Sequence, residues 1–494
     1  MSNSNLPKKR VFLTGATGNM GWSVFQELLK RRERFEIAIL ARPSKKNKEK
    51  LKEYINSNGI EIIWGDLTNY SDILNGVTGS DFVLHVGGMV SPYADSHPKE
   101  TMDVNITSAQ HIVKAVKSQP NCDEIGVIYV GSVAQMGNRL SPKHWGRAGD
   151  PICTSIFDWY SVSKSISELI FSESGLKKWA SIRQSGMLYP ALLNKANDPI
   201  TYHVPLNGVL EWSTVEDSGR VLANACEDWV PEQFWRGFYN LSSGPTFRLT
   251  NYQFESLLLK TISCPSVEKV FEPNWFATKN FHGMWYLDSD RLEDMLRFRE
   301  GISCEDYFKR LKSKLPWYFS LAKFAPSWPI KRFMKHIASS NQLGTLYWFN
   351  NDNDERIKAH FGSRQEWEKI PSWGSYKLEV PSQTPLILDH GYDESKPTEE
   401  LGIEDLRNAA QFRGGELLSE EMNKGDLFTP LKWRCQFGHT FEMTPNSVLK
   451  GGHWCPDCLP KFEGNGGAEQ WNFEETAKGN RFFAQLFDFK DINK

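Results

Sequence analysis

A tyrosine and a lysine stand four residues apart in the stretch FDWYSVSKSISE, where Tyr160 precedes Lys164. On an α-helix this spacing places both side chains on one face. A phenol beside an ammonium can exchange a proton with a substrate oxygen, because the positive charge stabilises the phenolate and lowers its pKa. The same pair is also common on ordinary helix surfaces, so the rest of the chain has to decide between the two interpretations.

A glycine-rich pattern, TGATGNMG over residues 14–21, predicts a dinucleotide-binding turn. It follows the short apolar run VFLTG and precedes a helical pattern, which is the context that this motif requires. Glycines there let the backbone approach a pyrophosphate, whose negative charge meets the helix N-terminus. The predicted cofactor-binding residues of this turn are Gly15, Thr17, Gly18, Asn19, Met20 and Gly21.

The residues after the next predicted strand indicate which dinucleotide binds. An acidic residue about 20 positions beyond the glycines would accept a hydrogen bond from the ribose 2′-hydroxyl of NAD. Here Ala41 and Arg42 stand at that position, followed by PSKK. A guanidinium matches a 2′-phosphate well, so Arg42 predicts NADP(H) in preference to NAD(H). The alternative is that this basic run is a solvated loop.

Strands alternate with helices over the first half of the chain. Such alternation predicts an α/β fold, a Rossmann doubly wound parallel sheet built with right-handed crossovers. We expect a smaller, mainly helical substrate-side region and a small C-terminal zinc-binding domain to follow it. The predicted strands cover residues 11–15, 35–42, 61–67, 81–88, 125–132 and 178–186.

Residues 8–250 resemble the extended short-chain dehydrogenase/reductase family, of the NAD-dependent epimerase/dehydratase type. The resemblance rests on the glycine turn, on YVGSVAQMG at residues 129–137, on DVNITSAQ, and on the Y-x-x-x-K spacing. In the family, the serine and tyrosine hold the reacting oxygen, the lysine also holds the ribose hydroxyls, and an asparagine supports the active-site helix. The catalytic residues that the resemblance implies are Ser132, Tyr160, Lys164 and Asn105.

The resemblance also assigns Asp66 and Leu67 to cofactor binding. The positions where this sequence departs from the family pattern bear on the class of substrate. Residues 86–88 read VGG where the family has an alanine-rich segment, and Gln184 stands where proline is usual. Residues 194–212 hold one glycine and no arginine, although sugar-nucleotide enzymes usually carry both there. These departures favour a less charged substrate.

The predicted function is therefore an NADP(H)-dependent oxidoreductase that interconverts a small-molecule carbonyl and alcohol. Reduction of a carbonyl needs a hydride on carbon, which the cofactor carries, and a proton on oxygen, which Tyr160 donates. Two alternatives stay open. One is a nucleotide-sugar epimerase or dehydratase with tightly held NAD, and the other is a non-enzymatic NADP-binding sensor or scaffold.

A cysteine and histidine pattern near the C-terminus predicts structural zinc. Residues 431–458 contain Cys435-x3-His439 and Cys455-x2-Cys458. Three thiolates and an imidazole suit tetrahedral Zn²⁺ with no open position for catalysis. The stretch resembles zinc-ribbon or treble-clef modules, and His453 is a rival ligand to His439. Few basic residues lie nearby, which favours a stabilising or protein-contact role over nucleic-acid binding.

The predicted organisation has five parts. They are a Rossmann NADP-binding domain at residues 8–250, a helical substrate-side cap at 251–345, a linker or extended segment at 346–404, a zinc-ribbon-like domain at 405–465, and a C-terminal tail at 466–494.

Composition and charge narrow the class of protein further. The 494 residues carry a net charge of −2 and are 24% charged, which is typical of a globular protein and gives no sign of a nucleic-acid partner. No apolar run reaches about 20 residues, and no signal segment opens the chain, so we expect a cytoplasmic protein.

Residues 316–338 mix aromatics with lysines and could rest on a membrane, but two prolines favour packing against the reductase or a partner. The family resemblance also implies a homodimer.

Overall fold

The computed structural model of the chain describes residues 7–194, 198–462 and 473–487. Part of the predicted zinc-ribbon segment and about half of the predicted tail, at residues 463–472 and 488–494, lie outside the described residues. The predicted domain boundaries remain predictions, and the arrangement that follows is described element by element.

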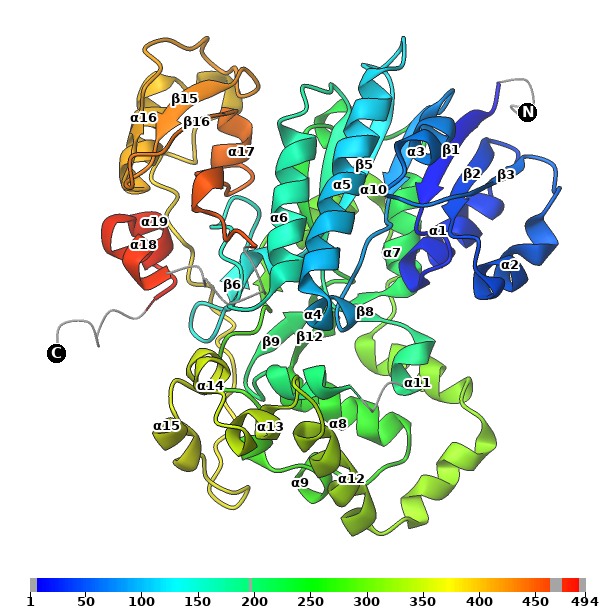
Figure 1. Cartoon of the computed structure of the whole chain (residues 1–494), viewed down its shortest axis with the longest axis vertical. Coiled ribbons are helices and arrows are strands. Elements are labelled where there is room, and N and C mark those ends of the chain that lie inside the picture. Colours follow the sequence, from blue (N-terminus) through cyan, green and yellow to red (C-terminus); the bar gives the residue numbers. More distant parts are fainter. Residues whose placement is uncertain (1–6, 195–197, 463–472, 488–494) are drawn as a thin grey trace.

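Seven parallel strands form the central sheet, in the order β11-β7-β5-β4-β1-β2-β3 (Figure 1). Strand β1 lies between β2 and β4, so the order reverses direction at this point and opens a crevice at the carboxyl ends of the strands. The predicted fold class is confirmed. The strands are β1 (Lys9–Thr14), β2 (Phe35–Ala41), β3 (Ile60–Trp64), β4 (Phe82–His85), β5 (Gly126–Ser132), β7 (Trp179–Gln184) and β11 (Gly237–Leu241).

Helices cover both faces of the sheet, which explains why its strands are apolar almost throughout. Along β1, Val11 and Leu13 pack into the cluster under one set of helices, and Phe12 packs into the cluster under the other. The first face carries α1 (Asn19–Leu29), α7 (Val215–Asn224) and α10 (Ser289–Leu296). The second carries α3 (Tyr70–Val77), α5 (Pro98–Lys117) and α6 (Trp159–Ser172).

A mainly helical region lies beyond the carboxyl ends of the strands, at the lower end of Figure 1. Short strands join it to the sheet: β6 (Trp145–Gly146), β8 (Met187–Leu188), β9 (Val209–Glu211), β10 (Ser213–Thr214), β12 (Arg248–Thr250) and β13 (Trp285–Tyr286). Its helices are α4 (Tyr93–Ser96), α8 (Asn251–Thr261), α9 (Val267–Val270), α11 (Cys304–Ser313), α12 (Ser327–Ser339), α13 (Thr345–Asn350), α14 (Asp354–Phe361) and α15 (Arg364–Glu368).

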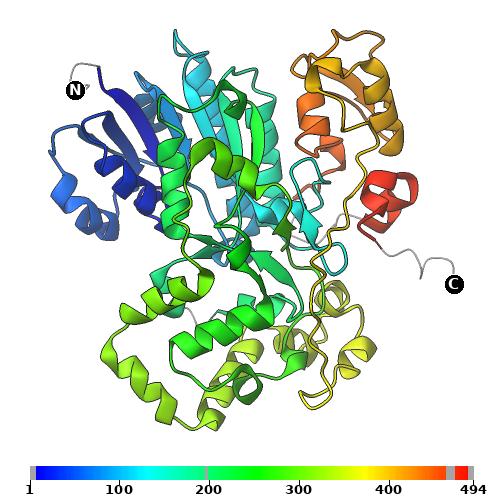
Figure 2. The ribbon, with the colours of Figure 1, turned by 180° about the vertical axis from the view of Figure 1, so that it is seen from behind.

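The segment that we expected to be a linker or extended begins with three helices, α13 to α15. Residues 369–397 then run without helix or strand from the helical region up to the C-terminal part of the chain (Figure 2). The Ser382 carbonyl accepts hydrogen bonds from the rings of His144 and Trp145, and His390 pairs with the buried Asp150 at 2.9 Å. These contacts fix the extended segment to the loop around β6.

The stretch 316–338 packs against the protein on one side only. It forms the 3-10 helix η8 (Trp317–Phe324) and helix α12. Met334 and Ile337 are buried, as the expectation of packing requires, but Trp328 is 67% exposed and Phe324 is 75% exposed. Packing against the reductase therefore does not cover these two aromatic side chains, and packing against a partner stays a prediction. Among the described residues, no helix has both the length and the apolar character needed to cross a membrane.

The C-terminal part forms a small module beside α6 (Figure 1). Its core gathers Trp433, Phe441, Leu406 and Phe482. The module contains an antiparallel sheet of β14 (Glu416–Leu417), β15 (Leu431–Arg434) and β16 (Thr440–Met443), with helices α16 (Ile403–Phe412), α17 (Pro445–Leu449), α18 (Phe473–Gly479) and α19 (Arg481–Ala484).

A buried charge network joins this module to α6 and the sheet. The Glu168 carboxylate on α6 accepts hydrogen bonds from Arg183 Nη2 on β7 at 2.6 Å and from His453 Nε2 at 2.7 Å. Arg183 also donates to the Gly451 carbonyl at 2.6 Å. Burial alone would raise the pKa of Glu168, but the guanidinium and the imidazole hold it well below its usual range. Glu168 therefore stays ionised while fully buried.

We expect Glu168→Gln to lower the free energy of unfolding by about 3–5 kcal/mol, because it leaves the Arg183 guanidinium buried without its carboxylate. Urea denaturation at neutral pH measures the change. Glu49→Gln is the matched control, since Glu49 pairs with Lys52 on the surface and such pairs contribute less than about 1 kcal/mol. Equal destabilisation by the two variants would contradict the role given to the network.

Candidate active site and candidate metal site

The glycine turn after β1 leaves no room for a side chain at Gly15 or Gly21. Gly15 has a φ of +74°, and a Cβ on it would lie 2.7 Å from the Gly87 nitrogen. A Cβ on Gly21 would lie 2.1 Å from the Gly15 carbonyl oxygen. Gly18 caps α1 without a side-chain hydrogen bond, and no acidic residue stands in the first turn. The free N–H groups and the bare backbone fit a dinucleotide pyrophosphate.

The VGG sequence at residues 86–88, which departs from the family pattern, is explained by close packing. The Gly87 N–H donates to Thr14 Oγ1 at 3.0 Å, at the end of β1. A Cβ on Gly87 would lie 3.0 Å from Leu67 Cδ1 and 3.1 Å from the Gly15 nitrogen. Leu67 thus lies beside the glycine turn, where the sequence places it. Its neighbour Asp66 accepts hydrogen bonds from the N–H and hydroxyl of Thr68.

Basic residues follow β2, and one of them contacts the glycine turn. Arg42 follows β2 and is exposed, and Ser44 caps α2 (Lys45–Leu51) by accepting from the Asn47 N–H. Lys50 on α2 donates to the Thr17 carbonyl at 3.0 Å. Sequence reasoning missed Lys50, since only the packing of α2 on the turn brings it there. No carboxylate occupies residues 41–48, so nothing in this stretch repels a 2′-phosphate.

The structure brings Ser132, Tyr160 and Lys164 together. Ser132 ends β5 and lies close enough to Tyr160 to lower the pKa of its phenol, against the effect of burial. Tyr160 lies in the first turn of α6, which Asp158 caps by accepting from the Ser161 N–H at 2.9 Å. Lys164 lies one turn further on, with Nζ 5.9 Å from the centre of the Tyr160 ring. That ammonium donates to the Val130 carbonyl at 2.9 Å.

Asn105 on α5 is buried and holds α6 in place. Its side-chain oxygen accepts from the Met89 N–H at 2.8 Å, and its nitrogen donates to Ser163 Oγ at 2.9 Å. The amide therefore links the loop after β4 to the helix that carries Tyr160. This is a positioning role, because the hydrogen bonds of Asn105 go to Met89 and Ser163.

The ionisation of the pair differs from the sequence expectation. Burial raises the pKa of Tyr160 to about 12, against the hydrogen bond from Ser132 and with the help of Asp158 and Asp95. Burial lowers the pKa of Lys164 to about 8. The expected lowering of the Tyr160 pKa is therefore wrong for this arrangement, because Lys164 Nζ bonds the Val130 carbonyl while two carboxylates face the phenol. The Tyr160 phenol is therefore protonated at neutral pH.

Charged residues from distant segments lie near the start of α6, and no sequence motif predicted them. The pKa of Asp95 on α4 is raised to about 7 by burial and by Asp158, despite the opposing effects of Ser91, His282 and Arg356. His282 Nδ1 lies 3.3 Å from the Asp158 carboxylate. Arg356 on α14 stacks at 4.0 Å on the ring of Phe157. These contacts place a cation from the helical region beside the first turn of α6.

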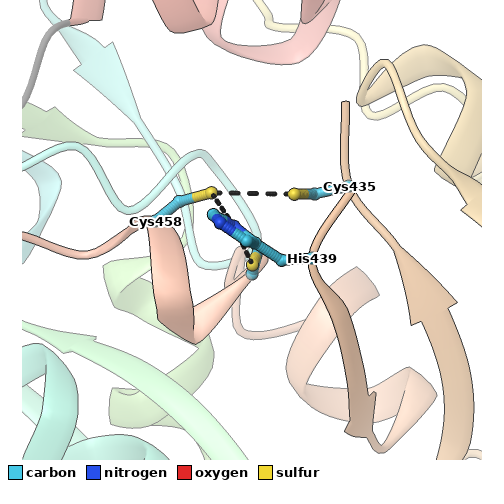
Figure 3. Close-up of side chains that lie close together, drawn as sticks. Cys435, His439 and Cys458 are labelled. Carbon is cyan, nitrogen blue, oxygen red and sulfur yellow. Dashed lines mark hydrogen bonds between the residues drawn. The ribbon is translucent and has the colours of Figure 1, made fainter. Parts of the chain in front are cut away.

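Four predicted metal ligands converge in the C-terminal module. Cys435, His439, Cys455 and Cys458 place one ligand atom each within 4.8 Å of the other three. Figure 3 shows Cys435, His439 and Cys458 directed at one another. The two sulfurs of Cys435 and Cys458 are 3.7 Å apart, and His439 Nδ1 is 3.4 Å from Cys458 Sγ and 3.7 Å from Cys455 Sγ.

These separations fit tetrahedral zinc. Bonds of about 2.3 Å to sulfur and about 2.0–2.1 Å to nitrogen give ligand separations of about 3.5–3.8 Å. Hydrogen bonds from Cys458 and His439 lower the pKa of the Cys455 thiol to about 6, which favours the thiolate that binds metal. His453, the rival ligand, points to Glu168 instead. The donor set is complete without it.

Part of the chain is similar to known proteins. Residues 12–188 match the model of the 3-beta hydroxysteroid dehydrogenase/isomerase family. Over 111 residues the chain is 31% identical to the UDP-glucose 4-epimerase of Rickettsia bellii (strain RML369-C) and 29% identical to that of Rickettsia prowazekii (strain Madrid E). Each match covers 22% of this chain and 32% of the relative, so the chain spans about a third of the length of the curated relatives it matches.

A solved structure shows the same fold. The dTDP-glucose 4,6-dehydratase of Bacillus anthracis, in complex with NAD, superposes with a TM-score of 0.50 at 14% identity and covers 63% of this chain and 96% of its own. Residues 12–188 are thus similar to the 3-beta hydroxysteroid dehydrogenase/isomerase family, and the solved structure shows a similarity of fold alone.

We expect His439→Ala to lose zinc and His453→Ala to retain it, because only the first removes a converging ligand. Elemental analysis of protein purified without chelator measures the zinc bound per chain. His453→Ala is the matched control, since it changes an imidazole in the same module and should lower only stability, through the Glu168 network. A wild-type protein without zinc, or zinc lost equally from both variants, would contradict the assignment.

Proposed function

We propose that the chain is a nicotinamide-dependent enzyme that interconverts a secondary alcohol and a ketone at Ser132, Tyr160 and Lys164. The observation that carries the proposal is that Ser132 lies beside the Tyr160 phenol, with Lys164 Nζ 5.9 Å from the centre of the Tyr160 ring. The dinucleotide turn adjoins this group. A Cβ on Gly88 would lie 3.8 Å from Lys164 Nζ, and the adjacent Gly87 touches Gly15.

The residues have complementary roles in this chemistry. When bound, the nicotinamide supplies or accepts the hydride. In the reductive direction Tyr160 donates its proton to the carbonyl oxygen, and the Ser132 hydroxyl holds that oxygen by a hydrogen bond. With its pKa near 8, Lys164 is mostly an ammonium at neutral pH and stabilises the phenolate that remains. Asn105 keeps α6 in register with the loop after β4.

A nucleotide sugar is the substrate class that we favour. The curated relatives are UDP-glucose 4-epimerases, whose name implies inversion at a sugar carbon. The sequence argued against a charged substrate because residues 194–212 lack an arginine. The Arg356 guanidinium, which comes from α14, offers a cation on the ring of Phe157, just before α6, that this argument did not include. A phosphate is a natural partner for an arginine.

An uncharged ketone or alcohol is the second candidate, favoured by the match of residues 12–188 to a hydroxysteroid dehydrogenase family. The two candidates share the hydride step and differ in what the substrate presents to Arg356. Turnover of UDP-glucose or dTDP-glucose to an epimer or keto-sugar, followed by chromatography, tests the first. Oxidation of NADPH by neutral ketones without any sugar-nucleotide turnover would favour the second.

For the cofactor we infer NADP(H), from Arg42 and the carboxylate-free stretch that follows β2. The dehydratase structure holds NAD, so NAD(H) is the alternative. For the C-terminal module we infer a structural Zn²⁺, held by Cys435, His439, Cys455 and Cys458. Because four protein ligands fill a tetrahedron, the ion would have no position for substrate. Homodimer formation and a cytoplasmic location remain predictions.

Tyr160→Phe should reduce kcat by about 10²–10⁴-fold, because it removes the proton that completes the alcohol. Steady-state rates with the substrate identified above measure the loss. Tyr54→Phe is the control, since the Tyr54 hydroxyl has only a 3.5 Å contact with Gln26 and lies outside the site. A Tyr160→Phe protein with unchanged turnover would instead support a non-enzymatic dinucleotide sensor.

Arg42→Glu should reverse the cofactor preference, lowering kcat/KM for NADPH by at least about tenfold while leaving or improving that for NADH. The carboxylate would repel the 2′-phosphate and accept from a 2′-hydroxyl. Lys48→Glu, a charge reversal on the exposed face of α2, controls for the general effect of such a reversal on the electrostatic field around the cofactor site. Equal use of both cofactors by the wild type would overturn the assignment to Arg42 without affecting the role of Tyr160.

A further inference from the structure

The segment from residue 312 to residue 335, which we term the basic aromatic face, exposes large apolar side chains in one place. Of the sixteen large hydrophobic residues that are exposed among the described residues, six lie between residues 317 and 333. They are Trp317, Tyr318, Leu321, Phe324, Trp328 and Phe333. Exposed apolar residues clustered in this way mark an interaction site, whereas scattered ones need no explanation.

The fold holds these side chains outward. Helix α12 buries Met334 and Ile337 against the cluster around Trp275, and the Tyr202 hydroxyl donates to the Met334 carbonyl at 2.8 Å. Trp328 and Lys335 stand on its opposite, exposed side. Figure 1 places α12 at the lower end of the molecule, away from the central sheet and the C-terminal module. The exposed face is thus presented by a packed helix rather than by a loose end.

The charge around this face has one sign. Residues 307–351 contain eight lysines or arginines and no aspartate or glutamate, in a chain whose net charge is −2. Lys309, Arg310 and Lys331 pair with carboxylates that precede this stretch. The others that lie on the face and form no ion pair with described residues are Lys312, Lys314, Lys323, Arg332 and Lys335. The face is therefore cationic as well as apolar.

We propose that the basic aromatic face binds the surface of an anionic lipid bilayer, with η8 and α12 lying in the interface. Aromatic rings insert at the headgroup level, and lysines beside them meet anionic lipids. A nucleic acid would also attract the lysines. It would leave Leu321 and Phe333 without an apolar environment, however, so the combination of aliphatic, aromatic and cationic side chains favours lipid.

Co-sedimentation of the full chain with vesicles tests the proposal. The vesicles contain phosphatidylcholine alone, or phosphatidylcholine with about 30% phosphatidylserine. We expect binding to the anionic vesicles only, weakened when salt is raised from about 0.1 M to about 0.5 M. The double variant Phe324→Ser/Trp328→Ser should bind at least about tenfold more weakly, and Lys323→Glu/Arg332→Glu/Lys335→Glu should lose the preference for anionic lipid.

Val380→Ser/Ile387→Ser is the matched control, because it removes two exposed apolar side chains from the extended segment, 91% and 62% exposed, and should leave binding unchanged. Circular dichroism and the melting temperature report whether each variant folds. Absence of wild-type binding, or binding that survives Phe324→Ser/Trp328→Ser, would overturn the proposal. The proposal would also be overturned if the wild-type protein is a dimer that binds no vesicles and that Phe324→Ser/Trp328→Ser dissociates. A second copy of the chain would then be what covers the basic aromatic face.

Discussion

The ionised Glu168 is the buried group on which the arrangement of the chain depends. A carboxylate without solvent requires fixed donors, and the donors come from β7 and from the loop before Cys455. Glu168 lies on α6 one turn beyond Lys164, so the same helix carries the proton-transfer residues and the link to the C-terminal module. The contact that satisfies this charge therefore also fixes the module beside the candidate active site.

A second constraint acts at the switch point of the sheet. The approach of Gly87 to Gly15 leaves no room for a Cβ, and this closeness brings the loop after β4 beside the glycine turn. Asn105 then ties that loop to α6. The dinucleotide turn and Tyr160 are thus connected through backbone contacts and one buried amide. A rigid connection of this kind is what hydride transfer requires, because the reacting groups have to be positioned closely.

The electrostatics of the site come from burial and from groups that belong to no motif. Desolvation shifts the pKa values of both Tyr160 and Lys164 toward the uncharged form, although Lys164 stays mostly an ammonium at neutral pH. Asp95 and Asp158 add negative charge near the phenol, and His282 and Arg356 compensate it. The helical region therefore contributes charge to the surroundings of the candidate active site that the sheet and α6 position.

Local geometry explains what the sequence by itself determined. Four features depend on contacts between residues that are near one another in the chain, so their spacing can be read from the sequence. They are the alternation of strands and helices, the glycine turn, the one-turn spacing of Tyr160 and Lys164, and the paired Cys and His ligands. Tertiary structure alone decided that Arg356 stacks on Phe157 just before α6, that His453 bonds Glu168 rather than joining the cysteines, and that Trp328 faces solvent. These outcomes depend on which distant surfaces pack together, and that packing is set by the whole fold rather than by any one segment.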